Sequence, residues 1–326
     1  MPTILFEAGS PPASPSTRTC TLVVARRRQA ADDVVELELR RPDDGPLPPW
    51  QPGAHVDLLL APGVTRSYSL CGDPAHAHVW RIAVLRADPG RGGSARVHDD
   101  LQLGVGVEVG LPRNNFPLVP AERYVFVAGG VGITPLLPMI AAAQARAADW
   151  TLLYGGRRRS SMAYLDELAH HGPRVRIRPH DETGMLDLAP VAAEAAAGAL
   201  VYCCGPEPLL AAAEAVVPAA RLRTERFAPR PAGAPGGDGP FVVELRRSGR
   251  TLTVPARGSL LSTLESAGVD VPQSCREGTC GSCETRVVAG DPDHRDSVLD
   301  EAERAAGTTM MVCVSRSRGP LLVLDL

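Results

Sequence analysis

Residues 272–283 read PQSCREGTCGSC and place Cys275, Cys280 and Cys283 in one short stretch of chain. Four residues separate the first two of these thiols, two residues separate the next two, and Cys313 follows far downstream. Four thiolates at this spacing are the ligand set of a plant-type 2Fe-2S cluster. The sequence therefore predicts a metal centre held by these four cysteines.

The residues between the cysteines are small, as a loop that wraps a cluster requires. Gly278, Gly281 and Ser282 let amide and hydroxyl groups turn toward the sulfurs, and hydrogen bonds of this kind should raise the reduction potential. Two alternatives remain open. One is a structural zinc site, which usually prefers paired Cys-x-x-Cys knuckles, and the other is a set of cysteines that merely pack.

The length and composition of the chain indicate two or three globular domains. It has 326 residues, of which 44% are hydrophobic and 22% charged. The net charge of −3 predicts no binding to nucleic acid. We also expect no membrane partner, since no run of about 18 apolar residues occurs and residues 1–17, a loose extension, lack the layout of a secretion signal. Eight cysteines that do not resemble a disulfide framework favour a reducing cytoplasm.

Short alternating apolar patterns between residues 19 and 109 predict a small antiparallel β-barrel. Val35, Leu37 and Leu39 alternate with polar residues, which is the periodicity of a strand. Several strands at close spacing favour a barrel, to which we assign residues 1–118. Further strand candidates are residues 54–60, 66–71, 79–86 and 105–110.

The pentapeptide RSYSL at residues 66–70 carries groups that suit a phosphate and a flat ring. On a regular strand, Arg66 and Tyr68 share one face, with Ser67 and Ser69 on the other. The guanidinium can hold a phosphate as a fork, and the phenol can stack on a ring. Such residues also decorate exposed strands, so the pentapeptide alone leaves both interpretations open.

A glycine-rich cluster precedes a helix-like segment at residues 95–101. The cluster comprises Gly90, Arg91, Gly92, Gly93 and Ser94. Glycines allow backbone amides to converge, and Ser94 can cap a helix whose amino end attracts an anion. The cluster predicts a phosphate cradle, with a flexible hairpin turn as the alternative.

From residue 124 the pattern changes to alternating strands and helices, which predicts a parallel α/β sheet. An apolar run at residues 124–128 ends in glycines and leads into an alanine-rich helical stretch at residues 136–148. We assign residues 119–228 to this nucleotide-binding domain. Further strands are expected at residues 151–154, 174–178 and 199–203, and helices at residues 162–171, 187–197 and 206–217.

Three strand ends in this domain carry candidate nucleotide ligands, since doubly wound sheets bind ligands at the carboxyl ends of their strands. The glycine turn after the first strand differs from Gly-x-Gly-x-x-Gly. Arginines at a strand end suit a phosphate, with a solvated loop as the alternative. The candidates are Gly129, Gly130, Gly132, Thr134 and Pro135 in the first turn, Arg157 and Arg159 after the second strand, and Cys204, Gly205 and Pro206 after the last.

The remainder of the chain predicts a linker and a third domain, so that the whole is a multidomain α+β and α/β protein. Residues 229–239 are rich in proline and glycine and predict a semi-flexible tether. Residues 240–326 have the layout of a ferredoxin-type β-grasp domain around the cysteine loop. Its expected elements are a hairpin at residues 241–245 and 251–254, a helix at residues 260–267, and strands at residues 285–289, 310–314 and 321–324.

The order of these motifs resembles the phthalate dioxygenase reductase family, the one-chain reductases of multicomponent oxygenases. The resemblance covers residues 19–326 and rests on residues 66–70, 90–94 and 129–135 together with the four cysteines. It implies that the barrel holds FMN, because residues 90–94 would close on a terminal phosphate where FAD relatives carry a segment that contacts adenine.

The resemblance also implies roles for single side chains around the flavin. Arg66 would touch the phosphate and Tyr68 would flank the isoalloxazine. Ser69 would lie near flavin N5. Glu225 and Phe227 would lie beside the flavin, with the Phe227 ring holding the nicotinamide site until the dinucleotide displaces it.

The resemblance places Thr134 and Cys204 at the nicotinamide position. The usual donor of the family is NADH, yet the three arginines after Tyr154 can accept the additional phosphate of NADPH. We predict that NADH is preferred with weak discrimination.

The cofactor set predicts an electron-transfer enzyme. A nicotinamide gives two electrons as hydride and an iron-sulfur cluster accepts one at a time, so a flavin must stand between them. We expect a monomer that passes single electrons to a terminal oxygenase on another polypeptide, because the chain carries neither Cys-x-His pairs of a Rieske centre nor an evident haem site. A Rieske-type acceptor is the first expectation. A cytochrome P450 acceptor and a redox-sensing regulatory module are the alternatives.

Overall fold

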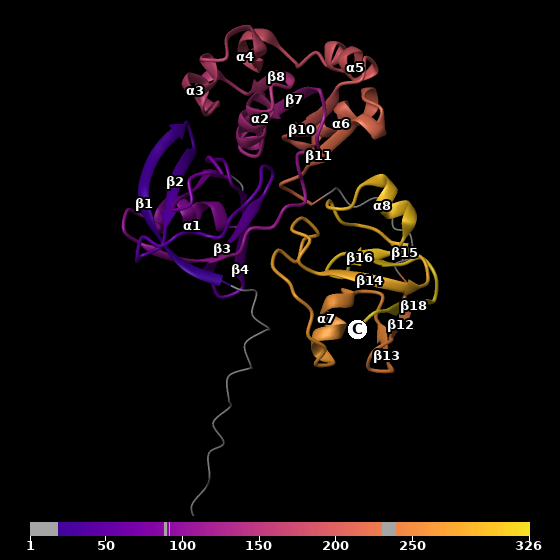
Figure 1. Cartoon of the computed structure of the whole chain (residues 1–326). Helices are drawn as coiled ribbons and strands as arrows, with labels where there is room; N and C mark the ends of the chain where they lie inside the picture. The colour runs from indigo at the N-terminus through magenta and orange to yellow at the C-terminus, as the bar shows by residue number, and fades with distance from the viewer. Residues whose placement is uncertain (1–18, 88–89, 91, 230–238) are drawn as a thin grey trace, which may run out of the picture.

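The computed structural model describes residues 19–87, 90, 92–229 and 239–326 (Figure 1). The predicted amino-terminal extension, Arg91 and most of the predicted linker lie outside these residues. The described chain forms an antiparallel sheet, a parallel sheet and a mixed sheet, one after another along the sequence. Within these ranges no helix has the length and apolar character needed to cross a membrane.

The first sheet has six strands in the order β4-β3-β6-β1-β2-β5, and all of its pairs are antiparallel. A bridge between Leu70 and Ile82 joins the two edges of the sheet, which closes it into the predicted barrel. Buried aliphatic residues such as Leu37 and Leu58 fill its interior. The elements are β1 (Thr19–Ala31), β2 (Val34–Arg40), β3 (His55–Ala61), β4 (Val64–Ser69), β5 (Trp80–Leu85), α1 (Gly93–Asp100) and β6 (Gly106–Gly110).

The second sheet is parallel throughout, with the strand order β11-β10-β7-β8-β9. The chain winds outward from β7 in both directions, so the strand order reverses between β7 and β10, which is where doubly wound sheets bind ligands. The strands are β7 (Arg123–Gly129), β8 (Asp149–Gly156), β9 (Val175–Pro179), β10 (Leu200–Cys204) and β11 (Leu222–Glu225), and the helices are α2 (Leu136–Ala145), α3 (Leu165–Ala169), α4 (His180–Thr183), α5 (Ala189–Ala196) and α6 (Glu207–Val216).

The helix expected at residues 162–171 is shorter than predicted, because α3 covers only Leu165–Ala169. Tyr164, the residue before it, has a φ of 66° and lies in the left-handed region. A non-glycine residue in that conformation interrupts a right-handed helix. The Tyr164 ring is buried and packs in the core between the barrel and the parallel sheet, so tertiary packing overrides the local helical pattern.

The third sheet is mixed and has the order β13-β12-β18-β14-β16, with β12 and β18 parallel and the other pairs antiparallel. This is the predicted β-grasp arrangement. Its elements, with a small two-stranded ladder beside it, are β12 (Phe241–Leu245), β13 (Arg250–Val254), α7 (Leu260–Ser266), β14 (Glu284–Ala289), β15 (Pro292–Asp293), α8 (Glu301–Ala306), β16 (Thr309–Met311), β17 (Arg316–Ser317) and β18 (Leu321–Leu324).

The strand expected at residues 310–314 ends early, at Met311. The amides of Val314 and Ser315 both donate to the Met311 carbonyl, at 3.2 and 2.9 Å, so the chain turns immediately after β16. The turn carries Cys313 to the cysteine loop. Helix α8 was not predicted, although Asp300 and Glu303 form a capping box at its start.

Candidate functional site

Strand β4 carries the predicted flavin contacts and pairs with β3, which sets where each side chain lies. Ser67 lies opposite Asp57, and Ser69 lies opposite His55. The Ser67 hydroxyl donates to Asp57 Oδ1 at 2.6 Å, so this serine is already engaged on the β3 side. Tyr68 packs against the barrel core, and burial raises the pKa of its phenol.

The residues of the predicted phosphate cradle come together where β4 meets the amino end of α1. A Cβ atom added to Gly93 would lie 2.5 Å from Arg66 Cγ and 2.7 Å from Arg66 Nε, so the arginine lies directly against the first residue of the helix. The N-cap residue Gly92 has a φ of 80°, a conformation that favours glycine. A guanidinium beside free helix amides is suited to an anion such as the FMN phosphate.

The predicted capping role of Ser94 is wrong. The N-cap is Gly92, and no side chain caps the helix. The Ser94 hydroxyl instead accepts a hydrogen bond from the Ala87 amide at 3.0 Å, which fixes the loop that leads into the helix. Gly90 lies in that loop, and Arg91 lies outside the described residues.

Replacing Gly93 with alanine should weaken FMN retention about fivefold to tenfold, equivalent to ~1 kcal/mol. The new methyl group would displace the Arg66 side chain from the helix end. Gly319→Ala is the matched control, because a Cβ at Gly319 meets nothing within 4 Å. Equilibrium dialysis of FMN would measure the effect, and equal retention by both variants would contradict this placement of the cradle.

Three side chains from three strands meet at the predicted hydride-transfer position. Cys204 of β10 lies opposite Glu225 of β11 in the parallel ladder, with its Sγ 3.9 Å from Glu225 Oε2. The Ser69 hydroxyl of β4 donates to the same carboxylate oxygen at 3.5 Å. Ser69 and Cys204 are buried.

Burial shifts the pKa values of Glu225 and Cys204. It raises the pKa of Glu225 to about 8, against the lowering effect of the contacts with Ser69 and Cys204. It also raises the pKa of the Cys204 thiol well above its usual value, to which the Glu225 carboxylate adds. Burial therefore favours the neutral form of both groups. Thr134 is buried nearby at the end of the glycine turn, and its hydroxyl donates to the Val131 carbonyl at 2.9 Å.

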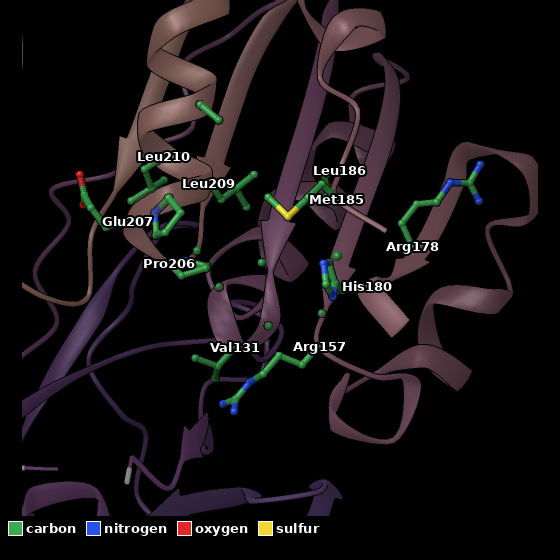
Figure 2. A pocket seen from close by; sticks show the side chains of 18 of the residues that line it. Val131, Arg157, Arg178, His180, Met185, Leu186, Pro206, Glu207, Leu209 and Leu210 are labelled. Atoms are coloured by element: carbon green, nitrogen blue, oxygen red, sulfur yellow. The ribbon is translucent and has the colours of Figure 1, made fainter. Parts of the chain in front are cut away.

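A cavity of about 480 Å³ opens at the carboxyl ends of β7, β8, β9 and β10 (Figure 2). Its size is in the range of small-molecule sites. A Cβ atom at Gly132 would lie 2.2 Å from the Cys204 carbonyl oxygen, so only glycine allows the turn after β7 to approach the end of β10. The predicted residues that line the cavity are Gly129, Gly130, Gly132, Arg157, Gly205, Pro206 and Phe227.

The other predicted nucleotide residues lie around the cavity without lining it. Arg159 forms an exposed ion pair with Glu182 at 2.7 Å. Pro135 is the buried N-cap residue of α2. Thr134 and Cys204 are buried behind the glycine turn.

Two basic residues at the end of β9 line the cavity and were not predicted. Arg178 and His180 line the cavity from the end of β9, and Figure 2 shows Arg157 directed toward Val131, away from Arg178. The strand-end rule that selected Arg157 would have selected both residues, since β9 belongs to the same parallel sheet.

The four predicted metal ligands converge. Cys275 contacts Cys280 and Cys313, and Cys313 also contacts Cys283, so the four thiols form one connected group. All eight cysteines are free of disulfides. The backbone amides of Glu277 and Thr279 point at Cys275 Sγ, at 3.3 and 3.4 Å. Amides aimed at a sulfur stabilise a thiolate, which fits the ligands of a 2Fe-2S cluster.

The loop conformation depends on two glycines with left-handed φ values. Gly278 has a φ of 71°, and a Cβ there would lie 2.6 Å from Val314 Cγ2. Gly281 has a φ of 75°, and a Cβ there would lie 2.7 Å from Nδ2 of Asn115. The second contact crosses from the cysteine loop to the segment that follows the barrel.

Two family models match the chain in the regions of these sites. Residues 126–215 match the oxidoreductase NAD-binding domain, and residues 243–318 match the 2Fe-2S iron-sulfur cluster binding domain. The second range includes all four clustered cysteines, which favours the 2Fe-2S interpretation over zinc.

Curated relatives extend over almost the whole chain. Phenoxybenzoate dioxygenase subunit beta of Ectopseudomonas oleovorans is 49% identical over 301 residues, which cover 91% of this chain and 94% of the relative. Phthalate dioxygenase reductase of Burkholderia cepacia is 40% identical over 316 residues, which cover 94% of this chain and 97% of the relative.

Two solved structures resemble the fold over almost the whole chain. An intact type IV self-sufficient cytochrome P450 monooxygenase is 43% identical, with a TM-score of 0.87 over 94% of this chain and 41% of the other. The chain thus spans about two fifths of that monooxygenase. Phthalate dioxygenase reductase, at 39% identity, has a TM-score of 0.68 over 94% of this chain and 98% of the other.

Proposed function

The chain belongs to the phthalate dioxygenase reductase family, and from this membership we propose that it delivers electrons from NADH to a Rieske-type terminal oxygenase on a separate polypeptide. It is an NAD(P)H-dependent oxidoreductase whose cofactors are FMN, a 2Fe-2S cluster and NADH. When bound, FMN supplies the conversion between a two-electron hydride donor and a one-electron acceptor.

One observation carries the proposal: the pair Ser69 and His55 lies between the two halves of the circuit. Ser69 contacts Glu225 at the edge of the nucleotide sheet. His55 lies directly opposite Ser69 on β3 and is buried close to the cysteine loop. Its ring interacts with the Cys275 side chain and with the backbone of Cys280. The β3–β4 pair therefore contacts the nucleotide sheet through β4 and the cysteine loop through β3.

We assign roles at the site from these contacts. Arg66 and the amino end of α1 would hold the FMN phosphate, and Tyr68 would lie against the flavin ring. Ser69, Cys204 and Glu225 surround the position of hydride transfer. Phe227 is 43% exposed and lines the nucleotide cavity, where its ring can give way to the incoming nicotinamide.

The choice of a Rieske-type acceptor rests on the curated relatives that match the chain over nearly their full length, whose names belong to dioxygenase systems. The test is anaerobic mixing of the NADH-reduced protein with a purified Rieske oxygenase, followed by the visible absorbance of the Rieske centre. Bleaching of that centre within a catalytic turnover time supports the proposal. Failure to bleach it while ferricyanide is reduced would exclude this acceptor.

A cytochrome P450 acceptor is the second candidate, and one observation favours it. At similar identities, the chain superposes better on the self-sufficient P450 monooxygenase than on phthalate dioxygenase reductase, with TM-scores of 0.87 and 0.68. The same mixing experiment with a P450 haem protein under carbon monoxide distinguishes the two acceptors, because reduced P450 gives its own absorbance band.

Arg157 should contribute more to dinucleotide binding than its neighbour Arg159. Arg157 lines the cavity, whereas Arg159 is exposed and paired with Glu182. We expect Arg157→Ala to raise the KM for NADH about tenfold, as for the loss of one charge-assisted hydrogen bond, and Arg159→Ala to leave it nearly unchanged. We also propose that wild-type protein prefers NADH over NADPH weakly. Steady-state assays with ferricyanide as the acceptor measure the KM for NADH of both variants and the preference of the wild type between NADH and NADPH. A larger rise in KM for Arg159→Ala than for Arg157→Ala would contradict the assignment.

We place the protein in the cytoplasm. All eight cysteines are unpaired, and the four at the loop must remain reduced to bind iron. Fractionation of the native cells followed by immunoblotting would test the compartment.

A further inference from the structure

A buried carboxylate on the barrel joins the flavin strand to the cysteine loop. Asp57 of β3 is 1% exposed and accepts a hydrogen bond from Ser67 on β4. Its other oxygen accepts from Arg113 Nη2 at 2.6 Å. Across the seam, Ser274 of the cysteine loop interacts with the same carboxylate. One side chain therefore touches the flavin strand, the segment after β6 and the residue before Cys275.

Two further side chains, one from the barrel and one from the segment that follows it, reach the backbone of the loop. Asn115 Nδ2 donates to the Cys280 carbonyl at 3.0 Å, between residues that are 165 positions apart in the sequence. His55, which is 5% exposed, interacts with the same carbonyl. The backbones of His55 and Arg113 exchange hydrogen bonds of 2.8 and 3.0 Å, which fixes these residues relative to each other. We call His55, Asp57, Arg113 and Asn115 the polar clamp.

The clamp has a composition that stability alone does not favour. Buried ion pairs contribute little net stability because desolvation offsets their attraction, and in some proteins they instead specify one relative arrangement of the groups that they join. His55 Nε2 and Ser274 Oγ are buried without a hydrogen-bond partner that meets strict geometry among the described residues. An apolar seam would avoid the cost of such atoms, so this polar one is suited to fixing position.

The position that the clamp fixes is the separation between the flavin strand and the cysteine loop. His55 and Asp57 lie opposite Ser69 and Ser67 in the β3–β4 ladder, so any shift of the loop relative to β3 is a shift relative to β4. Side chains that are locked by their own neighbours hold the groups of a functional site in a productive arrangement.

We propose that the polar clamp is a positioning device that holds the cysteine loop against the flavin strand for the transfer of electrons between them. The inference rests on the proposed function. In each cycle NADH gives one hydride, whose two electrons leave singly to two equivalents of the one-electron acceptor and whose proton is released to solvent. The clamp holds the same arrangement during both electron transfers. The clamp residues touch the loop backbone and Ser274, and they act through these contacts.

The test compares Asp57→Asn and Asn115→Ala with a matched control, Glu36→Gln. Glu36 is a 2% exposed barrel carboxylate that pairs with Arg28 at 2.6 Å, and it contacts none of the clamp. Asn115→Ala removes one side-chain hydrogen bond and leaves the barrel carboxylate in place, so it remains informative if Asp57→Asn unfolds.

Two measurements on the loaded protein decide the outcome. Hydrogen–deuterium exchange of residues 274–283 should rise about tenfold in the clamp variants, as expected for the loss of one net hydrogen bond, and remain unchanged in Glu36→Gln. In stopped-flow mixing with NADH, flavin bleaching should keep its rate, while the subsequent reduction of the iron-sulfur absorbance slows about tenfold. Unchanged exchange and an unchanged second phase in Asn115→Ala would overturn the proposal. Loss of the first phase in wild-type protein would instead contradict the proposed function.

Discussion

Replacing Cys283 with serine should leave flavin reduction by NADH intact and abolish reduction of a one-electron protein acceptor. Cys283 is 3% exposed and contacts Cys313 within the connected group of four thiols. A serine hydroxyl is a poor substitute for a thiolate at an iron-sulfur site. The loss of acceptor reduction should exceed about a hundredfold, the upper end for residues that only support a metal ligand.

The flavin half of the protein should survive this change because the parts that serve it come from other sheets. The proposed phosphate cradle lies between β4 and α1, and the proposed position of hydride transfer lies where β4, β10 and β11 meet. Rapid mixing with NADH under nitrogen follows flavin bleaching, and cytochrome c reports the one-electron output. Cys20→Ser is the control, since Cys20 lies on β1 with its thiol directed at the Val109 carbonyl. Loss of both signals in Cys283→Ser would mean that the cysteine loop has only a structural role.

Features set by neighbouring residues were predictable from the sequence. The cysteine spacing, the glycine turn after β7 and the glycines before α1 are local patterns, and the structure places each on the expected element. The register of β4 also follows from simple alternation, which puts Ser67 and Ser69 on one face. The prediction that Ser94 caps α1 was wrong, because its hydroxyl accepts a hydrogen bond from the Ala87 amide in the loop that leads to α1.

The spacing of residues in the sequence could not predict contacts between distant segments. Cys204 and Glu225 meet because β10 and β11 pair in parallel, and only the resemblance to a known family had linked them to one site. Asp57, Arg113 and Asn115 belong to no motif. Their contacts depend on how the cysteine loop packs against the barrel, which no local pattern encodes.

Replacing Glu225 with glutamine should remove a pH dependence from both stability and hydride transfer. The carboxyl pKa is about 8 in the folded protein, raised mainly by burial, against about 4.3 in an unfolded chain. A group with a raised pKa contributes stability that is present below its unfolded pKa and is lost as the pH rises through the folded value. Between about pH 5 and pH 8 the wild type should therefore lose about 4 kcal/mol relative to Glu225→Gln, at ~1.4 kcal/mol per pH unit.

The same titration bears on the rate because the carboxyl lies within 3.5 Å of the Ser69 hydroxyl, beside the predicted flavin edge. Hydride transfer brings negative charge to that edge, and an ionised carboxylate next to it opposes this charge, whereas a neutral carboxyl group does not. The wild-type rate of flavin bleaching should fall above about pH 8, and the rate of Glu225→Gln should stay level.

Urea unfolding and stopped-flow bleaching at pH 6 and pH 9 measure the two effects. Glu182→Gln is the control, because the pKa of Glu182 is lowered by its hydrogen bond to Arg159 and it is far from β11 along the sheet. A wild type and a Glu225→Gln variant with parallel pH profiles would show that the carboxyl is ionised throughout. In that case a fixed negative charge would stand next to the flavin, and burial could not be what keeps this corner neutral during hydride transfer.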